Sequence, residues 1–319
     1  MIKRIYNSIR FRTLHALEPY LLRKKNRKVS KYEINYDQNI YIFTNPRSGS
    51  TWLMEMFQTI PKTATIWEPF HPEHGPIKKH YQLGWRPYLP LDYPNQELVD
   101  SLKQVFRNGI YSDWTISRST LKQYKNAEKF IVKSVRANAL LPWITNNLEF
   151  NHKPILLLRH PIPTTLSHIK AFGENKDPWS HSEKALIEAD GPLFEPHKDY
   201  LLKLKSQLEF KLAVWCITNK EVLQYSEKKW QTIFYEKALL NPEEELFPIL
   251  DSLGGDLIKA KQIIEKPSWT SSGSYNQNAQ IQIDKWKKNF NEEQLVCLQK
   301  IFDHFNIQVY SAYSTLPID

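Results

Sequence analysis

The sequence predicts an α/β protein in which helices cover both faces of a central parallel sheet. Short apolar segments alternate along the chain with longer amphipathic ones, an order typical of parallel strands joined by helices. Residues 155–158, directly after Pro154, are continuously apolar, as expected of a strand that is covered on both faces. No internal repeat or long linker interrupts the chain. We therefore expect a single domain over residues 37–319, preceded by a basic arm at residues 1–36.

The first half of the chain contains four predicted strands, at residues 39–44, 63–67, 129–133 and 154–158. The predicted helices between them span residues 51–59, 96–107 and 137–147. The first helix is indicated by the helical spacing of Trp52, Leu53, Met56 and Phe57. Residues 71–95 are rich in proline, histidine and aromatic residues, which predicts irregular structure.

The second half continues with a helix at residues 161–171, which has a proline near its start. Further helices are predicted at residues 207–225, 242–253 and 292–305, and a fifth strand at residues 230–235. Gly254 and Gly255 stop the helix at 242–253. Residues 173–198 form a polar insertion, and residues 267–280 form a loop rich in Ser, Asn and Gln that is a candidate lid.

The segment Pro46-Arg-Ser-Gly-Ser-Thr51 joins the first strand to the first helix. Backbone N–H groups at a helix start have no intrahelical partner, and the helix dipole favours negative charge there. Arg47 adds a cation with several donors. These features predict an anion site, with phosphate as the expected ligand. A Walker A loop is excluded, because the segment has one Gly and no Gly-Lys-Ser/Thr.

Polar residues follow all five predicted strands. They are Arg47 and Ser48, Glu68, Lys133, Arg159, and Tyr235 and Glu236. Ligands of parallel α/β sheets bind beyond the carboxyl ends of the strands. We therefore expect these residues to converge on one crevice.

Three segments, in this order, resemble motifs of the sulfotransferases that use 3′-phosphoadenosine 5′-phosphosulfate (PAPS), in the form of the carbohydrate branch. The segment Pro46–Leu53 resembles the 5′-phosphosulfate loop. Arg159-His-Pro followed by Ser167 is similar to the 3′-phosphate element, with His160 where Asp or Asn is commoner. Residues 234–242 resemble the Tyr-Glu-Asp-Leu…Pro segment.

The resemblance implies a three-layer P-loop-like fold and PAPS as the co-substrate. It implies that the 5′-phosphosulfate is held by Arg47, Ser48, Gly49, Ser50 and Thr51. It further implies that Trp52 flanks the adenine, that Arg159 and Ser167 hold the 3′-phosphate, and that Tyr235 approaches the adenine edge. The nearest candidate for the family's C-terminal Gly-containing loop is Ser271-Ser-Gly273.

Sulfuryl transfer needs positioning of the reactants and stabilisation of the negative charge that develops. Arg and Lys side chains can supply the stabilising positive charge without a metal. Lys133 lies where cytosolic sulfotransferases have a strand-end Lys, but Val135 occupies the position of their catalytic His. Glu68 is therefore our candidate base, because Trp67-Glu-Pro-Phe-His71 is similar to a carbohydrate-sulfotransferase segment and because its aromatic neighbours would desolvate it. Its rivals are His71 and His74, whose spacing is no established metal-ligand pattern.

The net charge of +9 favours an anionic partner. We expect a hydroxylated acceptor, a carbohydrate or glycoconjugate, and no nucleic-acid partner. The arm carries nine Lys and Arg residues up to Lys28 and one acid, Glu18. It is interpreted either as a helix packed on the domain or as a membrane-surface contact.

Cys216 and Cys297 are too few for a disulfide framework, and no apolar run reaches the length of about 18 residues that spans a bilayer. These features predict a cytoplasmic protein. Two alternative functions stay open at this point. The chain could be a P-loop-type nucleotide kinase, or a non-catalytic protein that binds an anionic membrane or polymer.

Overall fold

The computed structural model describes residues 28–29, 31–77, 83–172, 191–225, 227, 229–266, 268 and 278–318. Most of the basic arm, much of the polar insertion, most of the candidate lid and the segment Ser271-Ser-Gly273 lie outside these residues. No helix among the described residues is long and apolar enough to cross a membrane.

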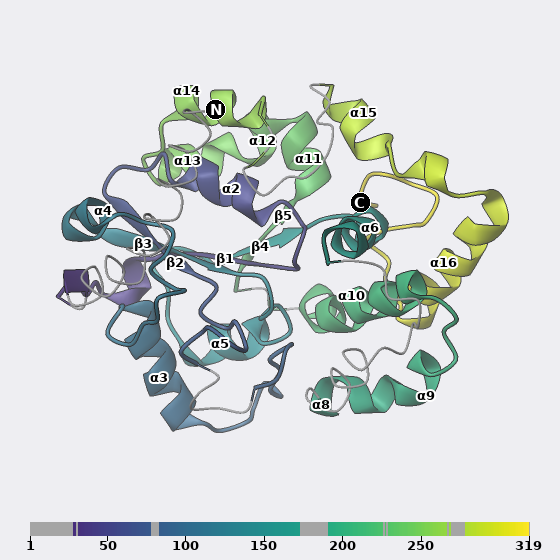
Figure 1. Ribbon diagram of the computed structural model, residues 1–319, viewed down its shortest axis with the longest axis horizontal. Coiled ribbons are helices and arrows are strands. Elements are labelled where there is room, and N and C mark those ends of the chain that lie inside the picture. Colours follow the sequence, from purple (N-terminus) through teal and green to yellow (C-terminus); the bar gives the residue numbers. More distant parts are fainter. Residues whose placement is uncertain are drawn as a thin grey trace, which may run out of the picture.

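Five parallel strands form one sheet in the order β2-β3-β1-β4-β5. They are β1 (Ile40–Thr44), β2 (Thr63–Trp67), β3 (Lys129–Ser134), β4 (Ile155–Leu158) and β5 (Gln231–Phe234). All five lie where the sequence predicts strands. The predicted α/β fold with a central parallel sheet flanked by helices is confirmed (Figure 1).

Six helices follow the predicted pattern: α2 (Ser50–Phe57), α3 (Gln96–Phe106), α5 (Leu141–Asn147), α6 (Pro161–Phe172), α10 (Gln207–Gln224) and α16 (Glu292–His304). The predicted helix at 242–253 is two helices, α12 (Pro242–Glu245) and α13 (Phe247–Ser252). Pro248 at the start of α13 has no N–H with which to continue the hydrogen bonds of α12.

The structure also contains helices that the sequence analysis does not predict. They are α4 (Leu121–Asn126), α8 (Gly191–Phe194), α9 (Lys198–Leu201), α11 (Tyr235–Leu240), α14 (Leu257–Ile264) and α15 (Ala279–Asp284). Short 3-10 turns occur at Tyr36–Gln38, Glu195–His197 and Lys287–Asn289.

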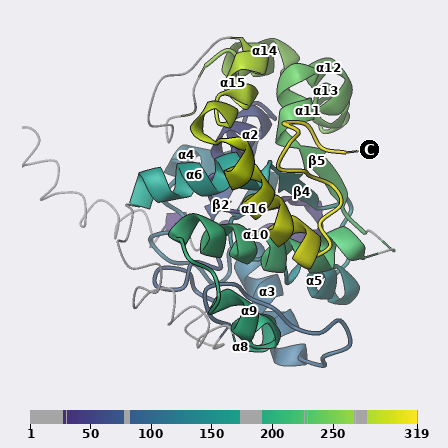
Figure 2. The same cartoon turned by 90° about the vertical axis from the view of Figure 1, so that its right-hand side faces the viewer.

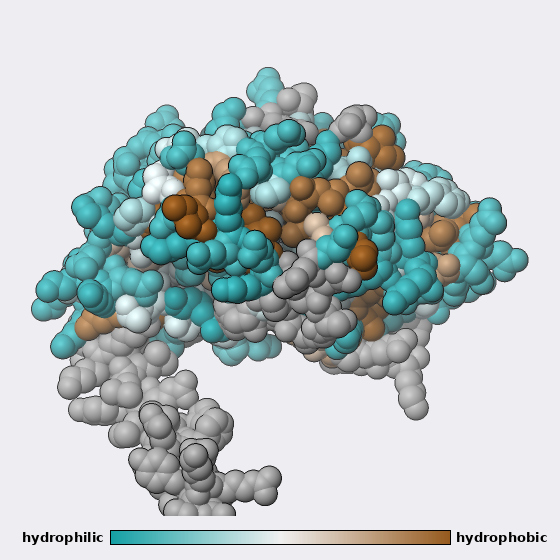
Figure 3. All heavy atoms as spheres, turned by 90° about the horizontal axis from the view of Figure 1, so that it is seen from above, coloured by the Kyte–Doolittle hydropathy of each residue, from teal (hydrophilic) through white to brown (hydrophobic). Residues whose placement is uncertain are grey.

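The sheet separates two hydrophobic cores, because successive side chains of a strand point to opposite faces. In β1, Tyr41 and Phe43 face one core, with α3, α5 and α10. Ile40 and Ile42 face the other, with α2, α11, α13, α14 and α15. Figures 1 and 2 show these two helical layers on either side of the strands. Seen from above, the layer that contains α11 to α14 has a mostly hydrophilic surface with separate hydrophobic groups between (Figure 3).

The end of the segment assigned to the basic arm packs against the domain. Val29 is fully buried in the core that contains α3 and α10, and Tyr32, Ile34 and Tyr36 pack against the same core. Asn108, in the turn after α3, donates its side-chain amide to the carbonyl oxygens of Val29 and Tyr32. The residues just before β1 are therefore part of the packed structure.

Candidate active site

A pocket of about 490 Å³ lies at the carboxyl edge of the sheet. Each of the five strands sends at least one lining residue into it: Arg47 after β1, Glu68 after β2, Lys133 near the end of β3, Arg159 after β4 and Tyr235 after β5. The sequence analysis expects these residues to converge, since parallel strands end at the same edge of a sheet.

The loop between β1 and α2 has an unusual backbone. Arg47 and Gly49 both have positive φ angles, of 69° and 89°. A Cβ atom on Gly49 would lie 2.7 Å from the ring carbons Cδ2 and Cε2 of Tyr235. Only glycine satisfies both the left-handed backbone and this close approach. Gly49 thus lets α2 begin directly against Tyr235, with Ser50 and Thr51 of its first turn lining the pocket.

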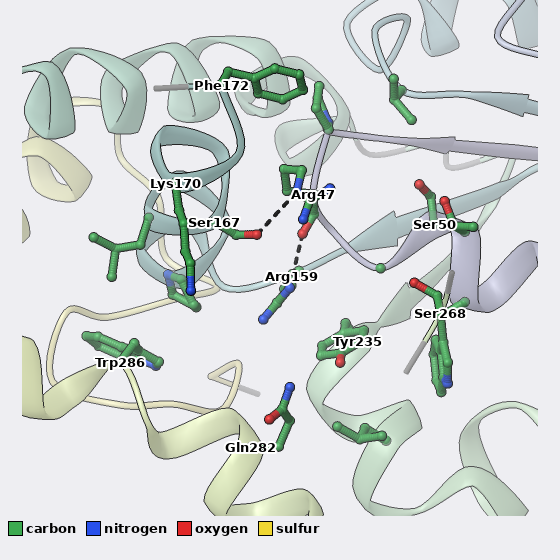
Figure 4. Close-up of a pocket in the computed structure, with 18 of the residues that line it drawn as sticks. Arg47, Ser50, Arg159, Ser167, Lys170, Phe172, Tyr235, Ser268, Gln282 and Trp286 are labelled. Atoms are coloured by element: carbon green, nitrogen blue, oxygen red, sulfur yellow. Dashed lines mark hydrogen bonds between the residues drawn. The ribbon is translucent and has the colours of Figure 1, made fainter. Parts of the chain in front are cut away.

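Arg47, Ser167 and Arg159 form one hydrogen-bonded group (Figure 4). Arg47 donates from Nε to Oγ of Ser167 at 3.2 Å, and Arg159 donates from Nη1 to the carbonyl oxygen of Arg47 at 3.0 Å. Burial and the nearby charge of Arg159 lower the pKa of Arg47, but a guanidinium starts so high that it stays charged. The residues assigned to the two phosphates thus touch each other.

Aromatic rings form the wall beside this group. The guanidinium of Arg159 lies 4.6 Å from the ring centroid of Tyr235. Trp52 meets Tyr235 edge to face, with centroids 5.4 Å apart. Burial raises the pKa of Tyr235, although the charge of Arg159 opposes the effect. The phenol therefore stays neutral, and it offers a flat apolar surface with one polar end.

Glu68 and Lys133 form an ion pair inside the pocket, with Lys133 Nζ 2.9 Å from Oε1 of Glu68. The same ammonium lies 3.8 Å from the ring centroid of Trp67. Burial lowers the pKa of Lys133, and the carboxylate of Glu68 works against that shift. Glu68 has a positive φ of 43°, and its N–H donates to the carbonyl oxygen of Lys133 at 2.8 Å. The sequence predicts both residues at the site but not their pairing.

Ser48 differs from its neighbours in the loop. Its side chain is buried and is not among the lining residues, and its N–H donates to the carbonyl oxygen of Asn45. The other loop residues assigned to the phosphosulfate, Arg47, Gly49, Ser50 and Thr51, line the pocket together with Trp52.

His71 and His74 stack on each other with ring centroids 4.6 Å apart. Nδ1 of His71 accepts from the backbone N–H groups of Glu73 and His74. Burial, followed by the charge of Arg136, lowers the pKa of His71 to about 4, so this imidazole is neutral at pH 7. Within the described ranges, no group of three or more His, Cys, Asp or Glu residues could hold a metal ion.

Another side of the pocket is formed by the C-terminal third of the chain and by α6, and the sequence analysis misses most of these residues. Its lining residues are Lys170, Lys266, Gln282, Lys285, Trp286 and Lys288. In the view of Figure 4, Lys170 and Trp286 lie across the pocket from Ser50. The available signal was Trp286 flanked by lysines at residues 285–288, a pattern that equally suits a core residue with solvated neighbours. Burial, then the charges of Arg159 and Lys170, lower the pKa of Lys285.

A buried amide network lies behind the loop between β1 and α2. Asn138 Nδ2 donates to Oδ1 of Asn45 at 2.7 Å and to Oδ1 of Asn219 at 2.8 Å. Asn219 Nδ2 donates to Oδ1 of Asn45 at 2.8 Å, and Asn45 Nδ2 donates to Oγ1 of Thr218 at 3.1 Å. The network joins the residue before the loop to the turn after β3 and to α10. A buried hydrogen-bonded network of this kind makes a local geometry rigid.

No protein-family model matches the chain, and a search of curated proteins finds no match. Solved structures of similar chain path include the sulfotransferase domain from the Synechococcus PCC 7002 olefin synthase, at 17% identity and a TM-score of 0.41, over 86% of this chain and 97% of that one. Another is the sulfotransferase domain from the curacin biosynthetic pathway, at 16% identity and a TM-score of 0.45, over 84% of this chain and 97% of that one. A third is mouse sulfotransferase SULT7A1 complexed with PAP, at 14% identity and a TM-score of 0.43, over 89% of each chain. Values this low carry no information on activity, so function must be inferred from the pocket.

Proposed function

We propose that this protein is a sulfotransferase that moves a sulfuryl group from PAPS to a hydroxyl group of a carbohydrate or glycoconjugate. The observation that carries the proposal is the charge of the pocket. Eight cationic side chains line it: Arg47, Lys133, Arg136, Arg159, Lys170, Lys266, Lys285 and Lys288. Among the described lining residues, Glu68 is the one carboxylate. A site with this charge suits a polyanionic ligand.

The residues fit a nucleotide with phosphate groups at both ends of the nucleoside. Arg47 and the first turn of α2 supply donors for the 5′ end. Arg159, Ser167 and Lys170 supply donors for a 3′-phosphate, and Tyr235 and Trp52 supply aromatic surface for the adenine. Because Gly49 lies against Tyr235, the residues for the 5′ end of the nucleotide lie next to the aromatic surface for the adenine. An ATP-type ligand is less well served, because no lysine stands in the loop.

PAPS, when bound, supplies the sulfuryl group and leaves as adenosine 3′,5′-bisphosphate. Glu68 accepts the proton of the acceptor hydroxyl, whose oxygen forms the new S–O bond as the bond to the 5′-phosphate breaks. Lys133 holds Glu68 in place and, with Arg47, stabilises the negative charge that develops on the transferred group and the leaving phosphate. The pairing orients the Glu68 carboxylate in the pocket, where Val135 offers no base.

Trp67 lines the pocket beside the Glu68–Lys133 pair, and its aromatic ring supports a sugar acceptor. Three further rings cluster outside the lining of the pocket, with His71 4.9 Å from Trp114 and 6.3 Å from Trp85 between ring centroids. Flat aromatic faces with nearby polar groups are typical of sites that bind rings carrying hydroxyl groups.

The donor assignment can be tested by thermal shift with adenosine 3′,5′-bisphosphate, 5′-AMP and Mg·ATP. We expect the bisphosphate to stabilise the protein most, by about 2.7 kcal/mol at a concentration one hundred times its dissociation constant. Arg159→Ala should remove most of the preference for the bisphosphate over 5′-AMP, whereas Arg107→Ala, in a surface pair with Glu33, should keep it. Stronger stabilisation by Mg·ATP would favour a kinase and overturn the proposal. Transfer from labelled PAPS to a panel of sugars then tests the acceptor class.

A further inference from the structure

Trp67 lies beside the Glu68–Lys133 pair and contacts the ammonium group of Lys133. It is the last residue of β2 and the registered partner of Lys133 in β3. Lys133 Nζ lies 3.8 Å from the centroid of the indole, inside the limit of about 6 Å over which a ring face attracts a cation. Arg118 lies farther from the same ring, at 4.9 Å. Trp67 and Lys133 both line the pocket and are only 4% and 2% exposed, and a cation–ring contact is strongest where water is excluded.

The ammonium group of Lys133 is held from two directions. It donates a hydrogen bond to Oε1 of Glu68 at 2.9 Å, and the ring of Trp67 lies against it. Among the described residues, Glu68 supplies its one hydrogen-bond acceptor. Because an ammonium group has three donors, Lys133 keeps donors for a ligand in the pocket.

The two contacts of Lys133 differ in what they do to its charge. Burial lowers the pKa of Lys133, and the charges of Arg118 and Arg136 act in the same direction. Glu68 opposes these effects, but its negative charge also offsets part of the positive charge that faces the pocket. An indole face attracts a cation and carries no net charge. The ring of Trp67 therefore favours the protonated amine and leaves its charge available to a ligand.

We propose that Trp67 is a positioning residue of the transfer reaction, whose ring holds the charged ammonium group of Lys133 between the carboxylate of Glu68 and the place of the sulfuryl group. The inference rests on the proposed function, because Lys133 takes part in the chemistry only if the pocket transfers a sulfuryl group. The ammonium group stabilises the negative charge that develops as the acceptor oxygen bonds to sulfur and the bond to the 5′-phosphate breaks. A charge that is fixed in place beforehand needs no reorganisation during this step.

The test replaces Trp67 with tryptophan analogues that carry one, two or four fluorine atoms on the ring. Each fluorine withdraws electron density from the ring face and weakens its attraction for a cation, while the shape of the side chain hardly changes. Nuclear magnetic resonance of the protein with isotope-labelled lysine follows the titration of Lys133, whose signal is the one lost in Lys133→Arg. We expect the pKa of Lys133 to fall stepwise along the series.

The rate of transfer from labelled PAPS to the best acceptor of the sugar panel is measured with the same proteins, at saturating acceptor. We expect this rate to fall along the fluorine series, and to fall by about tenfold in Trp67→Leu, where the ring is lost. The affinity for adenosine 3′,5′-bisphosphate, which lacks the sulfuryl group, should stay unchanged. A general loss of packing at Trp67 would not produce a graded response to fluorine.

Trp143 is the matched control. It is fully buried, its Nε1 donates to the carbonyl oxygen of Tyr93 at 2.8 Å, and it is not among the lining residues of the pocket. The same analogues at Trp143 should change neither the titration of Lys133 nor the rate of transfer. A constant pKa of Lys133 along the Trp67 series would overturn the inference, and so would a falling pKa with an unchanged rate. Weaker acceptor binding with an unchanged rate at saturation would assign the ring to the acceptor instead and would also overturn it.

The outcome is separable from that of the proposed function. The titration of Lys133 needs neither donor nor acceptor, so it shows whether Trp67 holds the ammonium group even in a protein that transfers nothing. Failure of transfer to every sugar of the panel overturns the proposed function, and with it the part of Trp67 in transfer, whatever the titration of Lys133 shows.

Discussion

Lys133 in β3 and Glu68, directly after the neighbouring strand β2, meet at 2.9 Å inside the pocket, with the Lys133 ammonium over the ring of Trp67. Removing one member of a buried ion pair costs about 3 to 5 kcal/mol, because the other charge is left without compensation. A substitution in this pair can therefore lower both turnover and the free energy of unfolding, and the two effects must be measured separately.

Glu68→Gln is the most informative substitution of this pair. Its amide oxygen can still accept a hydrogen bond from Lys133, but it cannot take a proton. We expect binding of adenosine 3′,5′-bisphosphate to change less than threefold and turnover with labelled PAPS to fall by about 10² to 10⁴, the usual contribution of a general base. Glu33→Gln removes a surface carboxylate and serves as the control. Turnover within twofold of the native rate would remove Glu68 as the base.

Gly49→Ala tests the close approach of the loop between β1 and α2 to Tyr235. The new Cβ would lie 2.7 Å from the Tyr235 ring at a φ of 89°, so the loop or the ring must move. We expect loss of nucleotide binding by at least tenfold, measured by titration calorimetry. Gly254→Ala is the matched control, because Gly254 has a φ of 77° but open space around its Cβ position. It should cost about 1 to 2 kcal/mol of stability from backbone strain and leave binding intact. Similar binding losses in both variants would contradict the assignment.

Asn219→Leu tests the amide network that holds Asn45. The substitution removes donors to Asn45 and to the carbonyl oxygen of Trp215, and the acceptor for Asn138. Each buried polar group left unsatisfied costs about 1 to 3 kcal/mol, so urea unfolding should show a clear loss of stability. Because the loop loses its support, turnover should fall more than the loss of folded protein explains. Asn146→Leu, at an exposed position, should leave both measurements unchanged. A purely structural role for the network would lower stability with normal turnover of the folded fraction.

The buried His160 should lower the free energy of unfolding of the protein in acid. Burial lowers its pKa to about 4, against 6.5 for the ordinary group, and its Nε2 faces the carbonyl oxygen of Ser311 at 3.0 Å. The unfolded chain therefore takes up a proton below pH 6.5 that the folded chain refuses until about pH 4. Between pH 7 and 4.5 this linkage removes roughly 2 to 3 kcal/mol, at about 1.4 kcal/mol per pKa unit.

Urea unfolding at the two pH values measures this loss, and the comparison is made with His160→Gln. That variant keeps a donor toward Ser311 and does not titrate, so its stability should fall less over the same pH range. An equal pH dependence in both proteins would assign the effect to other groups, such as His168, whose pKa is about 3.

Several helices show why sequence patterns succeed or fail. α10 is long and begins with a capping box at Ser206 and Glu209, and both its pattern and its start are visible in the sequence. α4 has an equivalent capping box at Thr120 and Gln123 but spans only six residues, too few for a periodic pattern to stand out. α11 starts immediately after β5 with no loop between them, so Tyr235 begins a helix where the sequence indicates the end of a strand.

The chain's local patterns were enough to predict the five strands, the loop before α2 and the crevice at their carboxyl ends, because strand and helix periodicity and glycine conformation act over a few residues. Tertiary structure alone decided which distant groups meet. It paired Lys133 with Glu68 across 65 residues of sequence, linked Arg47 to Ser167 across 120, and brought Lys285 and Lys288 to the same pocket. Such contacts depend on how whole elements pack, and a charged side chain has the same local pattern whether it faces solvent or a ligand.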